Sequence, residues 1–117
     1  MKTPILTIVL LAATLTAHAT SLNCAPQDQT KSAIVIVDKN EPVDPYSNKY
    51  HVSVGQTQYV GYGFVDDIHL GLNLYTETDQ GEDFAGIISG LPNGNGTYVM
   101  NFHLQAQSSP DAYTCQP

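Results

Sequence analysis

Few side chains in this sequence could do chemistry, and the histidines are the first to consider. Beyond the N-terminal segment they are His51, His69 and His103. Protein ligands that share one zinc ion are usually closely spaced or lie on a shared face, and neither H-x-H nor H-x-x-x-H occurs here. Each of the three falls on the polar side of an alternating segment. The sequence therefore predicts solvated surface histidines and no metal centre.

A cation held at a single turn is the weaker alternative. Asp66 and Asp67 stand next to a histidine, His69, and a carboxylate and an imidazole together can bind a metal ion. Neighbouring carboxylates in a turn usually point apart, which favours a solvated turn. We keep these three residues as candidate ligands.

A calcium ion could also be held at a turn, in this case by oxygen ligands alone. Extracellular modules often hold Ca²⁺ weakly with carboxylates from one loop. Asp79, Glu82 and Asp83 crowd one expected turn, and a second acidic segment covers residues 38–44. Neither has the spacing of an EF-hand loop, and acidic residues also serve simply to keep turns solvated.

The sequence offers little support for catalysis. No serine stands in a G-x-S-x-G motif, and no phosphate-binding loop or G-x-G-x-x-G motif is present. The chain also has no arginine, the side chain best suited to grip phosphate or carboxylate groups. We therefore expect a protein that is not an enzyme and that uses no cofactor.

The two cysteines indicate a structural disulfide. Cys24 and Cys115 lie near opposite ends of the chain, without the C-x-x-C spacing of a redox motif. A bridge enclosing so long a loop is worth about 4 to 5 kcal/mol in the chain-entropy model. We expect it to join the two ends of the folded domain.

The N-terminus is typical of a secretory signal peptide. Lys2 precedes an apolar run over residues 4–15, and Ala17 and Ala19 supply the small side chains of a cleavage site. The run is shorter than the roughly 20 residues needed to cross a bilayer. We expect cleavage after Ala19 and a secreted or periplasmic mature chain, residues 20–117, with no membrane span.

Composition narrows the class of partner. The 117 residues carry 11 Asp and Glu against 4 Lys and Arg, a formal charge of -7. Proteins that bind nucleic acid need cationic side chains for the phosphates, so this charge argues against them. If the protein has a macromolecular partner, we expect another protein.

Alternating apolar and polar residues predict strands and no helix. A run of five apolar residues at 33–37 is typical of a strand buried on both faces. A hairpin turning at Gly55 follows, and then Ile68, Leu70, Leu72 and Leu74 share one face. The expected strands cover residues 33–37, 49–54, 57–65, 68–75, 84–89 and 97–106, the last with Tyr98, Met100, Phe102, Leu104 and Ala106 on its core face.

Between these strands we expect irregular segments. Residues 20–31 are interpreted as a polar lead-in, 38–48 and 90–96 as loops, and 77–83 as a turn. The result is an all-β fold of about six strands, a small antiparallel β-sandwich or barrel, with the sandwich favoured. Glycines inside the strands, at Gly61, Gly63 and Gly71, mark a bend, a bulge or close backbone approach.

The remaining features favour a binding protein of unidentified partner. Tyr59, Tyr62 and Tyr75 are candidate contact residues, because aromatics fall on both faces of their strands and exposed tyrosine is favoured at interfaces. One alternative is an acidic inhibitor of a cationic partner such as lysozyme, steered by charge. The other is a calcium-stabilised surface or adhesion module.

Overall fold

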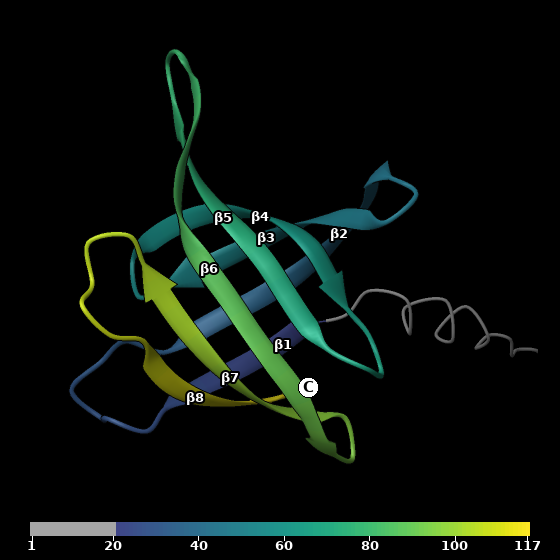
Figure 1. The fold of residues 1–117 in the computed structure, drawn as a ribbon, viewed down its shortest axis with the longest axis vertical. Coiled ribbons are helices and arrows are strands. Elements are labelled where there is room, and N and C mark those ends of the chain that lie inside the picture. Colours follow the sequence, from purple (N-terminus) through teal and green to yellow (C-terminus); the bar gives the residue numbers. More distant parts are fainter. Residues whose placement is uncertain (1–20) are drawn as a thin grey trace, which may run out of the picture.

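The computed structural model describes residues 21–117, which form eight strands and no helix. Each strand pairs antiparallel with its neighbour in sequence, and the last pairs with the first, so the sheet closes into an up-and-down barrel (Figure 1). In chain order the strands are β1 (Ser21–Pro26), β2 (Ile34–Asp44), β3 (Ser47–Val54), β4 (Thr57–Val65), β5 (Leu70–Thr78), β6 (Gly81–Gly94), β7 (Thr97–Leu104) and β8 (Asp111–Gln116).

The predicted all-β antiparallel fold is confirmed, whereas the favoured sandwich and the count of about six strands are wrong. The two strands that were missed, β1 and β8, are short and largely polar on their outer face. They lie at opposite ends of the described chain and pair with each other. The alternation of residues within one strand gives no indication of a partner so far away in the sequence. The predicted signal peptide, residues 1–19, lies outside the described residues. No helix in 21–117 is long and apolar enough to span a membrane.

Inward-facing side chains fill the barrel. Alternation correctly predicted Leu70, Leu72 and Leu74, all of which are buried. Ile68 is a wrong prediction, since it precedes β5 in the connection from β4 and is 77% exposed. Ala106 is also wrong because β7 ends before it and its side chain is exposed. The buried cluster comprises Leu22, Cys24, Ile34, Ile36, Tyr50, Val52, Tyr59, Leu70, Leu72, Leu74, Ile88, Tyr98, Met100, Phe102, Tyr113 and Cys115.

The first apolar run is buried on one face only. Ile34 and Ile36 point into the barrel and are at most 1% exposed, while Val35 and Val37 on the outer wall are partly exposed. The prediction of two buried faces is wrong because a barrel wall has one inner face, and among the described residues the outer face of β2 stays partly exposed.

Two segments expected as loops are strands. Residues 38–48 belong largely to β2 and β3. Of residues 90–96, the first five belong to β6, where they pair with β7, and only 95 and 96 form a turn. The outer ends of these strands extend past the barrel wall (Figure 1). Neither face of a strand is buried there, so its residues need not alternate between apolar and polar. Asn95 and Gly96 turn the β6–β7 hairpin with φ of 55° and 76°, which suits this pair of residues.

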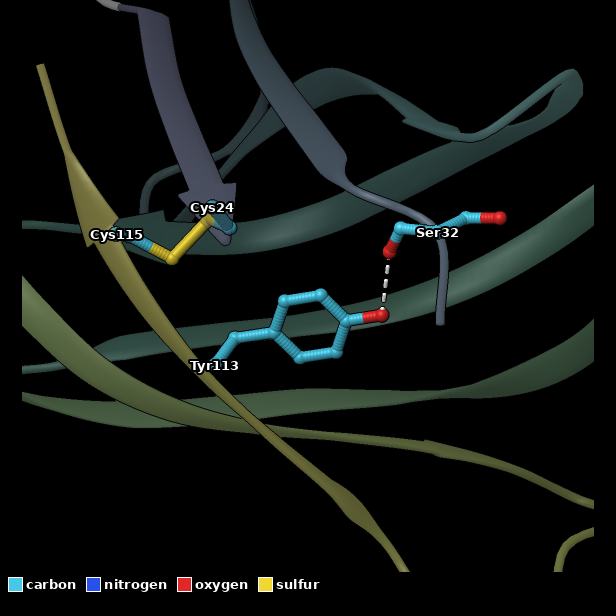
Figure 2. Close-up of a disulfide and its surroundings, with 4 residues drawn as sticks. All are labelled: Cys24, Ser32, Tyr113 and Cys115. Atoms are coloured by element: carbon cyan, nitrogen blue, oxygen red, sulfur yellow. Dashed lines mark hydrogen bonds between the residues drawn. A yellow bond between two sulfur atoms is a disulfide. The ribbon is translucent and has the colours of Figure 1, made fainter. Parts of the chain in front are cut away.

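The disulfide closes the barrel at its seam. Cys24 of β1 and Cys115 of β8 are direct cross-strand partners, bonded to each other and no more than 2% exposed. Figure 2 shows the bridge inside the wall, near the Tyr113 ring. The only disulfide among residues 21–117 therefore joins the first strand to the last.

Buried tyrosines tie connecting segments to the barrel. The Tyr113 hydroxyl donates to the Ser32 carbonyl at 2.7 Å (Figure 2), which holds the β1–β2 connection. The Tyr98 hydroxyl donates to the Asp66 carbonyl at 2.9 Å, and the Tyr50 hydroxyl accepts from the Val65 amide at 3.1 Å. Burial raises the pKa of these three phenols. Each ring thus adds to the core while its hydroxyl satisfies a backbone group.

Close backbone approach explains one of the strand glycines. Gly63 of β4 has φ of 153°, and a Cβ atom there would lie 1.9 Å from the Gly71 carbonyl oxygen of β5. Since L side chains rarely adopt this backbone conformation and no room exists for one, glycine is required. The expected close approach of strands at this position is confirmed.

Removing the disulfide should lower stability without changing the fold. We expect Cys24→Ala/Cys115→Ala to lose about 4 kcal/mol of unfolding free energy, because the open chain gains loop entropy when it unfolds. Urea unfolding of the oxidised wild type, the reduced wild type and the double variant measures the difference. Equal midpoints for all three would contradict a stabilising seam.

Gly63→Ala should destabilise the barrel by about 3 kcal/mol, because positive φ and a backbone clash act together. Gly94→Ala is the matched control. It also has positive φ, 91°, but nothing lies within 4 Å of the added Cβ, so we expect a loss of only about 1 kcal/mol. Thermal or urea unfolding measures the loss of unfolding free energy in each variant. Similar losses would contradict the prediction, because they would mean that the backbone near residue 63 shifts to relieve the clash.

Candidate functional site

The filled interior directs attention to the outer wall. An eight-stranded barrel is just wide enough for side chains to fill, and sixteen buried side chains form one cluster inside this one. Contacts with another molecule therefore have to come from outward-facing residues or from the connections at the two ends.

The structure keeps the three histidines apart. They lie on β3, in the β4–β5 connection and on β7, and each has its own polar neighbour. The His51 ring meets the Gln58 side-chain oxygen, the His69 ring lies 3.3 Å from the Asp66 carboxylate, and the His103 ring lies 2.9 Å from a backbone carbonyl. They do not form one site.

The Asp66, Asp67 and His69 group forms a structured turn. The Asp66 carboxylate accepts hydrogen bonds from the amides of His69 and Ile68, which lowers its pKa. Within residues 21–117, no three His, Cys, Asp or Glu side chains are grouped so that they could hold a metal ion. Calcium binding at Asp79, Glu82 and Asp83 stays a prediction of the sequence.

A projecting acidic hairpin is the most unusual feature of the outer surface. The pairing of β4 with β5 ends at Tyr75, and the pairing of β6 with β7 begins at Gly86. Residues 76–83 consequently pair only with one another and extend beyond the barrel (Figure 1). We call this segment the acidic hairpin. It carries four exposed carboxylates and no lysine or arginine: Glu77, Asp79, Glu82 and Asp83.

Two of these carboxylates face each other. Glu77 on β5 and Glu82 on β6 are direct cross-strand partners. Like charges in this position repel and destabilise a strand pair. Folding alone would favour a lysine at one of the two positions, so the pair is a candidate for a role in binding.

Aromatic side chains form a platform at the base of the hairpin. The Tyr75 ring packs edge-to-face with Tyr62 and with Phe84, at 5.6 Å between centroids in each pair. The Tyr62 hydroxyl donates to the Glu82 carboxylate at 2.7 Å. One contact thus links the platform to the acidic hairpin and fixes the position of a carboxylate.

The structure separates the three candidate tyrosines. Tyr62 and Tyr75 are partly exposed on the outer wall and touch, whereas Tyr59 is 8% exposed and belongs to the core. Sequence reasoning missed Phe84 and the pairing of Glu77 with Glu82. Extending the alternation through the segment read as a turn, residues 77–83, would have brought these carboxylates opposite each other.

Comparison with known proteins yields no match, whether to a family model, to a curated protein or to a solved structure. The assignment of this surface therefore depends on its geometry and chemistry.

The Tyr62–Glu82 contact predicts a measurable titration. Chiefly the hydrogen bond to Glu82, and then burial and nearby charge, raise the pKa of Tyr62 from 10.0 to about 12. The contact stabilises the fold below pH 10, and its contribution is lost as pH rises toward 12. We expect Glu82→Gln to lower the pKa of Tyr62 toward its ordinary value, as measured by phenolate absorbance with Tyr62→Phe as the reference.

Asp79→Asn is the control for this titration, because it removes the same charge from the hairpin and leaves the hydrogen bond in place. It should leave the pKa of Tyr62 near that of the wild type. Equal shifts in both variants would mean that overall hairpin charge, and not the hydrogen bond, governs the phenol.

Proposed function

We propose that this protein is an exported, non-enzymatic binding protein whose partner is a basic protein, and that the acidic hairpin makes the first contact. The observation that carries the proposal is the facing pair of Glu77 and Glu82 on a segment that extends beyond the barrel. A cationic side chain of a partner, placed between these carboxylates, would relieve their repulsion and gain two ionic contacts.

The charge of the whole molecule supports a cationic partner. Residues 21–117 hold 11 acidic side chains and three lysines, and one of these, Lys31, already lies 3.9 Å from Asp111. A strongly negative surface attracts a positive protein from a distance and raises the association rate. Lysozyme, a small basic protein, is the candidate partner that we propose to test.

Export is supported by two independent features. The N-terminal sequence has the organisation of a signal peptide, and a buried disulfide is typical of proteins that fold in an oxidising compartment. A basic partner would be met in that same compartment or outside the cell.

The hairpin charges should control how fast lysozyme binds. At low salt we expect Glu77→Gln/Glu82→Gln to reduce the association rate constant about tenfold, because the attraction that orients the encounter is lost. Added salt should slow the wild type and remove most of the difference. Stopped-flow or surface-plasmon measurements with the mature protein give both rate constants.

Glu41→Gln/Asp44→Asn is the matched control. It removes two negative charges from the β2–β3 hairpin, which is three strands around the barrel from β5 and β6, the strands of the acidic hairpin. The asparagine keeps the side-chain oxygen that accepts a hydrogen bond from the Tyr46 amide. This control should change the rate less than twofold. Equal slowing by both variants, or no binding of lysozyme to the wild type at low salt, would contradict the proposal.

A further inference from the structure

Strand β6 exposes apolar side chains on its outer face. Phe84, Ile87 and Leu91 are 39%, 46% and 63% exposed, and Val99 of β7, the cross-strand partner of Leu91, is 44% exposed. The outer face of a barrel wall in contact with water is expected to be polar, as at Asn101 farther along β7. We call the four apolar residues the β6 stripe.

A bulge in β6 brings these side chains onto one face. Ala85 is an extra residue opposite the step from Leu74 to Tyr75, so Phe84 and Ile87 both point outward although they are three positions apart. Strict alternation would have turned one of them into the barrel. The backbone irregularity therefore lengthens the exposed apolar surface.

The stripe ends at an open depression of about 420 Å³ that crosses β6, β7 and β8. Leu91 and Val99 contribute to its lining, and no lining residue is charged. The polar groups beside them are amides and hydroxyls, from Gln27, Ser89, Asn101 and Thr114. A partner's apolar side chain would fit such a depression, while the amides and hydroxyls could hydrogen-bond its backbone.

We infer that the β6 stripe and this depression form the apolar centre of the interface with the same basic protein that the acidic hairpin attracts. This inference rests on the proposed function. The surfaces are continuous along one strand, since Glu82 of the hairpin is two residues before Phe84. An apolar centre beside a charged rim is the usual arrangement of a specific interface.

Charge favours a basic partner over a second copy of this chain. Two copies docked through β6 would each bring an acidic hairpin and a large net negative charge to the contact. Like charges brought together at an interface oppose association. With a basic protein the electrostatic interaction is attractive, and such a protein can still cover the apolar stripe.

The test separates the two surfaces by their rate constants for lysozyme. Ile87→Ser/Leu91→Ser should raise the dissociation rate constant about tenfold or more and leave the association rate constant within about twofold, because short-range apolar contacts act after the encounter. Both positions face outward, so circular dichroism and the melting temperature should match the wild type.

Val43→Ser/Tyr46→Ser is the control. These side chains are 53% and 75% exposed on the β2–β3 hairpin, on the far side of the barrel from β6. The control should bind lysozyme like the wild type. If the stripe variant also does so while the charge variant Glu77→Gln/Glu82→Gln still binds slowly, the stripe is not part of the interface and the inference is overturned, but the proposed function stands.

Two further outcomes count against the inference. If the wild type does not bind lysozyme at low salt, both proposals fall together. If sedimentation shows that the wild type is a dimer that Ile87→Ser/Leu91→Ser converts to a monomer, the stripe is covered by a second copy of the chain, and the assignment to a basic partner is wrong.

Discussion

The structure depends on the pairing of its first strand with its last. Register places Cys24 directly opposite Cys115, so one disulfide joins the first strand to the last and locks the strand pair that closes the barrel. Closure leaves no open sheet edge in the wall, which protects it from strand-to-strand association. It also draws the apolar side chains of all eight strands into one interior, which they fill. The surface that the proposed partner could contact is therefore the outer wall and the hairpins.

The sequence predicted those parts of the fold that face the interior. Leu70, Leu72 and Leu74 alternate because one side of β5 meets the core, and the hairpin that turns at Gly55 follows the same rule. Prediction failed where a strand leaves the core. Residues 38–44 and 90–94 are largely paired strand, yet they show no regular apolar alternation that would reveal it, and both contain prolines. The choice of barrel over sandwich depends on the β1–β8 pairing, which no local pattern encodes.

The candidate surface was only partly predictable for a similar reason. The acidic residues of 77–83 and the tyrosines at 62 and 75 stand out in the sequence by type. Only the strand register shows how these residues are arranged. It places Glu77 opposite Glu82 and brings Tyr62 into contact with both Glu82 of the hairpin and Tyr75 of the aromatic platform. The β6 stripe was hidden because the bulge at Ala85 interrupts the alternation, so Phe84 and Ile87 do not fit the same period in the sequence.

Magnitudes explain how so small a barrel tolerates an unfavourable surface. A like-charge cross-strand pair costs about 0.2 to 1 kcal/mol, and the residues of the hairpin that holds it pair only with one another and not with the other strands of the wall. The buried disulfide contributes about 4 kcal/mol by restricting the unfolded chain, and it joins β1 to β8, whereas the acidic hairpin is formed by β5 and β6. Because the residues that we propose for binding are not those that stabilise the barrel, the acidic hairpin and the β6 stripe can be unfavourable in the free protein without threatening the fold. A surface with these properties gains most from being covered by a partner of opposite charge.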